Sequence, residues 1–259
     1  MTRNTEFAIA YNRRGNRDVS KGDYKSAIDN YKKAIEFDPS YKDAYINIGD
    51  IYSNLLNHEE SIFYYSKAIV LDPGCAEVFI KRGMAYGNIG DYDLESQDYS
   101  KAIELTPGDT SLYGKRGIVY MLTGRYREAI DDYTKLIQLT PSFYWAYAIR
   151  GDALQAIGLY RNAIEDYNSF ISVYPDYPQV YNNRGKAYEG LGMDKDALLD
   201  FSRAIELMPE FSEAYTNTNR GELLSGMGNY NDAVVDLKTA ARLGNKHAQN
   251  LLKSKSIEW

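Results

Sequence analysis

The chain of 259 residues is 44% hydrophobic and 25% charged, a composition that excludes intrinsic disorder and allows a large buried core. Its net charge of −6 gives no basic footprint for a phosphate backbone, so nucleic acid is not an expected partner. No apolar run approaches the roughly 18 residues of a membrane-spanning helix, and the N-terminal stretch lacks the apolar segment of a signal peptide, so we expect a cytoplasmic protein with no membrane partner.

Residues of several types recur along the chain with a period of 34 positions. Glycines keep this spacing from Gly15 to Gly185, and prolines keep it from Pro39 to Pro209. Two further series consist of mostly small residues and of aromatic residues: Ala27, Ser61, Glu95, Ala129, Ala163 and Ala197, and Tyr31, Tyr65, Tyr99, Tyr133, Tyr167 and Phe201. Because independent residue types share one register, the pattern predicts tandem copies of one structural unit.

Each unit predicts two helices in chain order. The first ends at a glycine-containing turn such as NIGDY (88–92), because glycine adopts the backbone angles of a helix stop. The second follows the pattern AIxxYxxAI, in which apolar residues have the spacing of a buried helical face. A proline then ends it, because proline disfavours helical geometry in the residue before it. The glycine of the first helix, such as Gly15, leaves room for the second helix to approach closely.

The register of these residues resembles the tetratricopeptide repeat family, whose pattern is an aromatic, Leu-Gly, Tyr, Ala, an aromatic, Ala and Pro. Two stretches carry the resemblance clearly: AYINIGDIYSNLLNHEESIFYYSKAIVLDP (44–73) and VYNNRGKAYEGLGMDKDALLDFSRAIELMP (180–209). The resemblance implies an all-α fold, a right-handed superhelical solenoid of tandem helix-turn-helix repeats.

We expect one solenoid domain over residues 1–259. Its seven repeats are expected at residues 8–41, 42–75, 76–109, 110–143, 144–177, 178–211 and 212–245. The seventh reaches Gly221 after 36 residues in place of 34, so its first helix should be longer or bulged. Residues 246–255 are expected to form a capping helix, because stacked repeats need a polar outer end. The N-terminal repeat has no such cover, which leaves self-association through it open.

An arginine precedes the glycine in six repeats, at the seventh position, which faces the second helix. Five of these arginines have an aspartate 16 residues later: Arg82 and Asp98, Arg116 and Asp132, Arg150 and Asp166, Arg184 and Asp200, and Arg220 and Asp236. Arg14 has Asn30 at this spacing, and the second repeat has the apolar pair Ile48 and Tyr64. Because both partners change together, we interpret the pairs as bidentate contacts inside each repeat. The alternative is a ladder of cations that binds a polyanion, which the available carboxylates and the negative net charge disfavour.

The opposite face of the first helix, formed by positions 2, 5, 9, 12 and 13, is the candidate binding surface. By resemblance to the family, it lines a concave groove that binds extended peptides or partner helices. Its candidate residues are polar, then apolar, then polar along the chain: Asn12, Asn16, Asp50 and Asn54; Ile80, Met84, Ile118, Met121, Leu122 and Trp145; and Asp152, Asn182 and Lys186. An apolar centre with a polar rim is typical of interaction sites. The alternative is that Met121, Leu122 and Trp145 pack against neighbouring helices.

These features favour a protein-interaction scaffold that binds a protein or peptide. An alternative is a regulatory or substrate-selecting module that acts with a partner enzyme such as a glycosyltransferase. The carboxylate clamp of chaperone-binding family members is disfavoured, because its Lys, Asn and Arg positions hold other residues, among them Asp50 and Met84. His58 and His247 lie in different repeats and Cys75 has no activating neighbour, so we expect no catalytic site, no metal and no cofactor.

Overall fold

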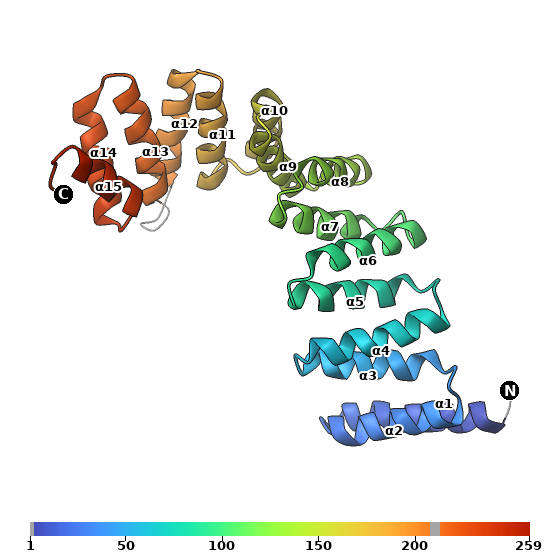
Figure 1. Ribbon diagram of the computed structural model, residues 1–259. Coiled ribbons are helices and arrows are strands. Elements are labelled where there is room, and N and C mark those ends of the chain that lie inside the picture. The colour runs from blue at the N-terminus through green and yellow to red at the C-terminus, as the bar shows by residue number, and fades with distance from the viewer. Residues whose placement is uncertain (1–2, 208–212) are drawn as a thin grey trace. The chain divides into compact units, whose positions relative to one another are not determined.

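The computed structural model describes residues 3–207 and 213–259 (Figure 1). Over these residues the structure consists of fifteen α-helices with no strand, which confirms the predicted all-α class of tandem helix-turn-helix repeats. The chain divides into two compact units, Met1–Gly124 and Arg125–Trp259.

In the first unit, three helical hairpins are followed by a further helix, and the helices stack in chain order from blue to green in Figure 1. The helices of this unit are α1 (Arg3–Val19), α2 (Tyr24–Phe37), α3 (Lys42–Asn54), α4 (His58–Leu71), α5 (Ala76–Asn88), α6 (Tyr92–Leu105) and α7 (Thr110–Leu122). The second helix of each hairpin begins at a polar cap: the side chains of Asp23, Asn57 and Asp91 each accept a hydrogen bond from a backbone N–H of the first turn.

In the second unit, one helix is followed by three hairpins and a terminal helix. The helices of this unit are α8 (Tyr126–Leu139), α9 (Tyr144–Ala156), α10 (Tyr160–Ile171), α11 (Pro178–Gly190), α12 (Asp194–Leu207), α13 (Glu213–Gly226), α14 (Tyr230–Arg242) and α15 (Lys246–Ser254). α13 has 14 residues where α11 has 13, so the first helix of the last hairpin is longer, as its insertion predicts. Ala248 and Leu252 of α15 are fully buried and cover the apolar face of α14.

The two helices of a hairpin touch at the glycine of the first helix and the aromatic residue of the second. A Cβ atom added to Gly151 would lie 2.7 Å from Cε1 of Tyr167, and one added to Gly185 would lie 2.7 Å from Cε1 of Phe201. The aromatic rings are buried, with Tyr167 and Phe201 both 0% exposed. The predicted close approach is therefore confirmed, and a larger residue than glycine at this position would force the helices apart.

The arginine before this glycine holds the hairpin together by a paired hydrogen bond. In the hairpin of α5 and α6, Nε and Nη2 of Arg82 donate to the two carboxylate oxygens of Asp98 at 2.8 and 2.7 Å. The same bidentate geometry joins three further pairs: Arg150 and Asp166, Arg184 and Asp200, and Arg220 and Asp236. These four predicted pairs are confirmed. Arg116 and Asp132 belong to different units, and their pairing stays a prediction.

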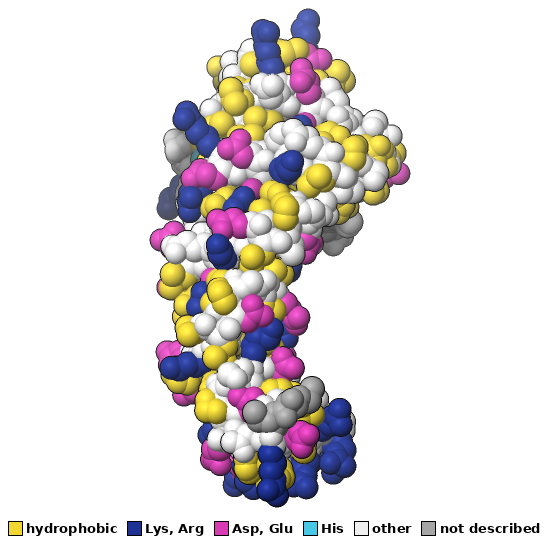
Figure 2. Space-filling view, turned by 90° about the vertical axis from the view of Figure 1, so that its right-hand side faces the viewer, with side chains coloured by type: hydrophobic (Ala, Val, Ile, Leu, Met, Phe, Trp, Pro, Cys, Tyr) yellow, Lys and Arg dark blue, Asp and Glu magenta, His cyan; other side chains and the backbone are white. Residues whose placement is uncertain are grey.

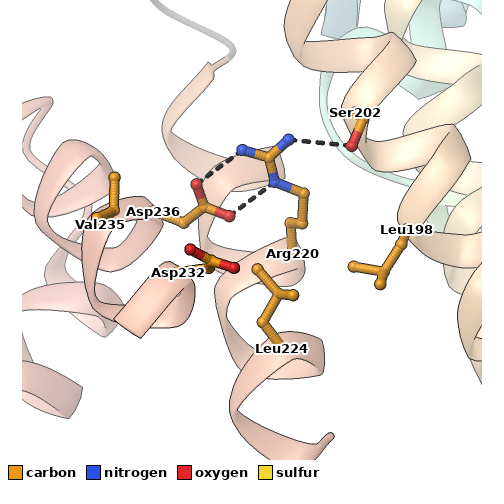
Figure 3. A pocket seen from close by; sticks show the side chains of 7 residues that line it. All are labelled: Leu198, Ser202, Arg220, Leu224, Asp232, Val235 and Asp236. Carbon is orange, nitrogen blue, oxygen red and sulfur yellow. Dashed lines mark hydrogen bonds and ion pairs between the residues drawn. The ribbon is translucent and has the colours of Figure 1, made fainter. Parts of the chain in front are cut away.

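The third nitrogen of each guanidinium makes a contact that the sequence analysis did not foresee. Nη1 of Arg220 donates to Ser202 of α12 at 3.0 Å while the other two nitrogens bind Asp236 (Figure 3). The equivalent bonds to the second helix of the preceding hairpin are Arg82 to Ser66, Arg116 to Ser100, Arg150 to Thr134 and Arg184 to Asn168. One arginine therefore links both helices of its own hairpin to the hairpin before it.

Aromatic rings shield these arginines from water. The guanidinium of Arg184 lies 5.4 Å from the ring centre of Tyr181 and 5.8 Å from that of Tyr188, one turn to either side along α11. Its side chain is 16% exposed and that of Asp200 is 8% exposed. The charges are thus largely removed from solvent, a state that requires pairing.

Arg14 and Asn30, which have the same spacing as the arginine and aspartate pairs, contact other groups. The Asn30 amide donates instead to Asp18 of α1 and to the backbone oxygen of Ser26, while the Arg14 guanidinium lies exposed, 5.1 Å from the ring centre of Tyr11. Because Asn30 is neutral, it does not attract a guanidinium from water as an aspartate does, and Arg14 stays at the surface.

Removing one partner of an arginine pair is predicted to cost far more than replacing both. Asp166→Ala should lower the free energy of unfolding by about 3 kcal/mol, because it leaves the guanidinium of Arg150 without its carboxylate. The double change Arg150→Ile with Asp166→Tyr copies Ile48 and Tyr64 and should be nearly neutral. Urea denaturation followed by circular dichroism measures both. Equal losses in the two variants would contradict a structural role for the pair.

A second stability prediction concerns Leu56, which has a φ of 58° at the turn after α3, where other hairpins have a glycine. Leu56→Gly should raise the free energy of unfolding by about 1 kcal/mol, because glycine adopts this left-handed conformation without strain and the leucine is 76% exposed. Leu55→Gly is the matched control; its φ of −83° needs no glycine, so it should not stabilise the chain. A lower melting temperature for Leu56→Gly than for the wild type would show that the backbone at Leu56 is not strained.

Candidate functional site

In several hairpins, the side chain at the ninth position of the first helix accepts a hydrogen bond from a tyrosine hydroxyl of the second helix. The Tyr31 hydroxyl donates to Asn16 at 2.7 Å, and the Tyr65 hydroxyl donates to Asp50 at 2.8 Å. In the second unit the Tyr167 hydroxyl donates to Asp152 at 2.8 Å. The polar side chains that the sequence assigned to the groove therefore also provide the hydroxyl partners of buried tyrosines.

The same polar side chains also bind the next hairpin. Lys81 of α5 donates to both carboxylate oxygens of Asp50 at 2.8 and 2.7 Å, and Asn183 of α11 donates to Asp152 at 2.8 Å. Asp50 and Asp152 thus each connect three helices, and part of their hydrogen-bonding capacity is already used within the protein.

Two of the candidate asparagines lie inside the stack rather than on its surface. Asn12 is 7% exposed and accepts a hydrogen bond from Asn47 at 2.9 Å. Asn182 is 4% exposed and accepts one from Asn219 at 2.8 Å. The structure places both amides between consecutive hairpins, whereas Asn16, Asn54 and Lys186 are exposed.

Burial changes the electrostatics of Asp152. Desolvation raises the pKa of its carboxyl above the usual value, although the hydrogen bonds from Tyr167 and Asn183 lower it. A hollow of about 460 Å³ beside it is also lined by Gln155, Lys186 and Glu189. Desolvation and the neighbouring charge of Glu222 raise the pKa of Glu189 as well. This part of the second unit is polar and mainly acidic.

The apolar candidates of the first unit share one hollow. Met84, Ile118 and Leu122 are 48%, 52% and 66% exposed, and together they line a pocket of about 390 Å³ between α5 and α7. Ile80 and Met121, on the same two helices, are half-buried. Leu122 is therefore not a core residue, and three large apolar side chains of the candidate surface are accessible to a partner.

Trp145, in the second unit, belongs to an aromatic cluster. Its ring centre lies 4.9 Å from that of Phe170, 6.0 Å from that of Tyr174 and 5.0 Å from that of Tyr177. It remains 38% exposed. Trp145 thus packs against the end of α10 and the turn that follows it, and it also presents an edge to solvent.

The pocket of the first unit contains a carboxylate that the sequence analysis did not select. Glu95 of α6 lines it together with Gly87, Tyr99 and Lys115. The sequence already marks Glu95 as an exception, because the other members of its 34-residue series are small residues such as Ala129. That departure indicated a larger polar group where the other hairpins have almost no side chain.

Over the described residues, the structure contains no group of three His, Cys, Asp or Glu that could hold a metal ion. His247 contacts Glu222 at 2.9 Å on the surface, and His58 begins α4. Within the same ranges, every helix is too short or too polar to cross a lipid bilayer. Over most of the face drawn in Figure 2, Lys and Arg side chains lie among Asp and Glu side chains, which does not favour a polyanion site.

Family models together match residues 15–211 of the chain. A model described as "TPR repeat" matches residues 15–55, and models described as "Tetratricopeptide repeat" match residues 43–75, 76–109, 111–143, 146–177 and 178–211. A search of curated proteins finds no match.

Solved structures share the fold. The crystal structure of the MamA protein is 29% identical and has a TM-score of 0.58, over 64% of this chain and 91% of that chain. YrrB, described as a TPR protein with an unusual peptide-binding site, is 22% identical with a TM-score of 0.62 over 69% and 92%. The C-terminal part of a TPR repeat-containing protein from Cytophaga hutchinsonii is 17% identical with a TM-score of 0.73 over 92% and 98%.

The tyrosine contacts of the second unit predict a difference between two otherwise similar substitutions. Tyr167→Phe should cost about 1 kcal/mol of unfolding free energy, because Asp152 loses a donor in a desolvated site. Tyr133→Phe is the matched control; among the described residues its buried hydroxyl has no partner, so the change should be neutral or stabilising. Chemical denaturation of both variants measures the difference. Equal losses of unfolding free energy in the two variants would contradict a stabilising hydrogen bond between Tyr167 and Asp152.

Proposed function

Because the chain belongs to the tetratricopeptide repeat family, we propose that it is a protein-interaction scaffold that binds a peptide segment or helix along the groove face of its first helices. The proposal is non-enzymatic and needs no cofactor. A cytoplasmic location, the absence of nucleic-acid partners and self-association through the N-terminal repeat stay predictions of the sequence.

The observation that carries the proposal is the shared exposure of Met84, Ile118 and Leu122 in one hollow. Met84 and Ile118 occupy the ninth position of their helices, where the neighbouring hairpins have Asp50 and Asp152. Exposing large apolar side chains to water is unfavourable, so an apolar stretch in a series of polar positions favours a surface that a partner covers. A peptide-binding site is also described for YrrB, which has the same fold.

Each unit has its own candidate surface. In the first unit, the apolar pocket is preceded by the exposed Asn16 and Asn54 and by Asp50, whose side chain is 36% exposed. These groups can hydrogen-bond the backbone of an extended peptide. The candidate residues of the second unit are Trp145, Asp152 and Lys186, of which Asp152 and Lys186 line one hollow. The buried Asn12 and Asn182 support the neighbouring hairpins and are not proposed to touch the partner.

Selection from a phage-displayed library of random 12-residue peptides tests this function. The wild-type chain should enrich peptides with apolar side chains at regular spacing, and Ile118→Ser with Leu122→Ser should weaken the binding of a selected synthetic peptide at least about tenfold, because two exposed apolar contacts are lost. Fluorescence polarisation gives the dissociation constants.

The matched control is Val70→Ser, which removes an exposed apolar side chain (80%) from α4, outside the pocket. Its affinity should equal that of the wild type. Loss of binding in Val70→Ser, or full binding by the double variant, would place the peptide elsewhere and contradict the proposal.

A further inference from the structure

Glu95 is the member of the small-residue series that has a long, charged side chain. At this position the second helices of other hairpins have Ala27, Ala129, Ala163 and Ala197, all 0% exposed, and Ser61, also 0% exposed. Glu95 is only partly exposed. A carboxylate at a position that is fully buried in the other hairpins needs space that those hairpins do not have.

Gly87 of the facing helix provides that space. A Cβ atom added to Gly87 would lie 2.5 to 2.7 Å from the carboxylate atoms of Glu95. The twelfth position of the first helix, which Gly87 occupies, has Ser53, Met121 and Gln155 in neighbouring hairpins. Two departures from the repeat pattern therefore occur in one hairpin and fit each other: a large acidic residue on α6 and the loss of a side chain on α5.

Burial disfavours the charged form of the Glu95 carboxyl. Desolvation by burial raises its pKa above the usual value, and this effect exceeds the opposite effects of a hydrogen bond from Tyr99 and of the charge on Lys115. The ionised form, which predominates at neutral pH for an ordinary carboxyl, is therefore less stable here than in water. A cation that entered the site would relieve this cost.

The position of Glu95 defines what the site can bind. It lines the same pocket as the exposed Met84, Ile118 and Leu122, so a negative charge lies beside an accessible apolar surface. Lysine and arginine side chains match both features, because their aliphatic stems pack on apolar groups while the terminal cation pairs with a carboxylate.

We propose that the pocket between α5 and α7 binds a lysine or arginine side chain of the peptide, with the cation on Glu95 and flanking apolar residues on Met84, Ile118 and Leu122. This inference rests on the proposed peptide-binding function and specifies the chemistry of the segment that is bound. Glu95 is then the residue that sets the specificity of the first unit, and Gly87 is the residue that makes its position accessible.

The proposed role of Glu95 in binding also predicts how its charge affects the stability of the folded chain. Because burial raises the folded-state pKa of Glu95 above its unfolded value, the folded chain binds this proton more tightly than the unfolded chain. Its contribution to stability therefore falls as the pH rises from the unfolded pKa through the folded pKa. Glu95→Gln, which keeps the shape of the side chain against Gly87 and removes its charge, should melt at a higher temperature than the wild type at pH 7.5 while losing its preference for cations.

Peptide selection on the full chain tests the inference directly. A phage-displayed library of random 12-residue peptides is selected on the wild type, on Glu95→Ala and on Glu104→Gln, which alters an exposed carboxylate of the same helix that is paired with Lys101. The wild type and Glu104→Gln should enrich peptides with one fixed lysine or arginine among apolar residues. Glu95→Ala should enrich apolar peptides without a fixed cation.

A synthetic peptide from the wild-type selection then gives the size of the effect. Replacing its fixed lysine or arginine by norleucine should weaken binding to the wild type about tenfold and binding to Glu95→Gln less than about twofold, a difference typical of a charge-assisted pair. Circular dichroism and thermal melting establish that each variant is folded.

The outcomes separate this inference from the function on which it rests. Enrichment of apolar peptides without a fixed cation on the wild type, or with the same fixed cation on Glu95→Ala, overturns the role of Glu95 and leaves the peptide-binding function in place. Enrichment of no peptide on any of the three chains overturns both. A melting temperature of Glu95→Gln below that of the wild type at pH 7.5 contradicts the cost assigned to the buried charge of Glu95.

Discussion

A bidentate contact between an arginine and an aspartate joins the two helices in four of the hairpins that the structure describes. In a hairpin such as α9 and α10, Arg150 binds both oxygens of Asp166 and extends its third nitrogen to Thr134 of α8. A planar guanidinium presents these three N–H groups in a fixed fork, whereas the ammonium group of a lysine is a compact point charge. The contact fixes the register inside a hairpin and between consecutive hairpins with one side chain, and it leaves these cations unavailable to an anionic ligand.

Because those cations are paired, the polarity of the groove face depends on the residues at positions 2, 5, 9, 12 and 13 of the first helices. Asp50 and Asp152 each accept a hydrogen bond from a tyrosine of their own hairpin and another from the hairpin that follows. These carboxylates therefore connect consecutive hairpins and also belong to the groove face. Where Met84 and Ile118 replace them, the surface becomes apolar and accessible. Glu95 adds a carboxylate to that stretch, and burial raises the pKa of this group. An ionisable group beside an accessible apolar surface favours a role in recognition.

The periodicity of glycine, proline and aromatic residues was sufficient to predict the helical hairpins, and the covariation of the seventh position with the residue 16 positions later predicted four bidentate pairs. The bonds from Arg82 to Ser66 and from Asn47 to Asn12 were missed, because they join different hairpins and depend on how consecutive hairpins stack. The helical wheel placed Asn182 on the surface for the same reason. Glu95 was visible as an exception, but its meaning required the structure, which brings it against Gly87.

Nitrogen-15 NMR of the arginine side chains measures the central claim most directly. For the folded chain at neutral pH, the account predicts slow rotation of the guanidinium groups of Arg82, Arg150, Arg184 and Arg220, with separate Nη signals, because each guanidinium is held by a carboxylate and a neighbouring hairpin. Arg14, at the surface, provides the averaged reference. Averaged signals for all five arginines would show that the guanidiniums are free in solution and would contradict the account.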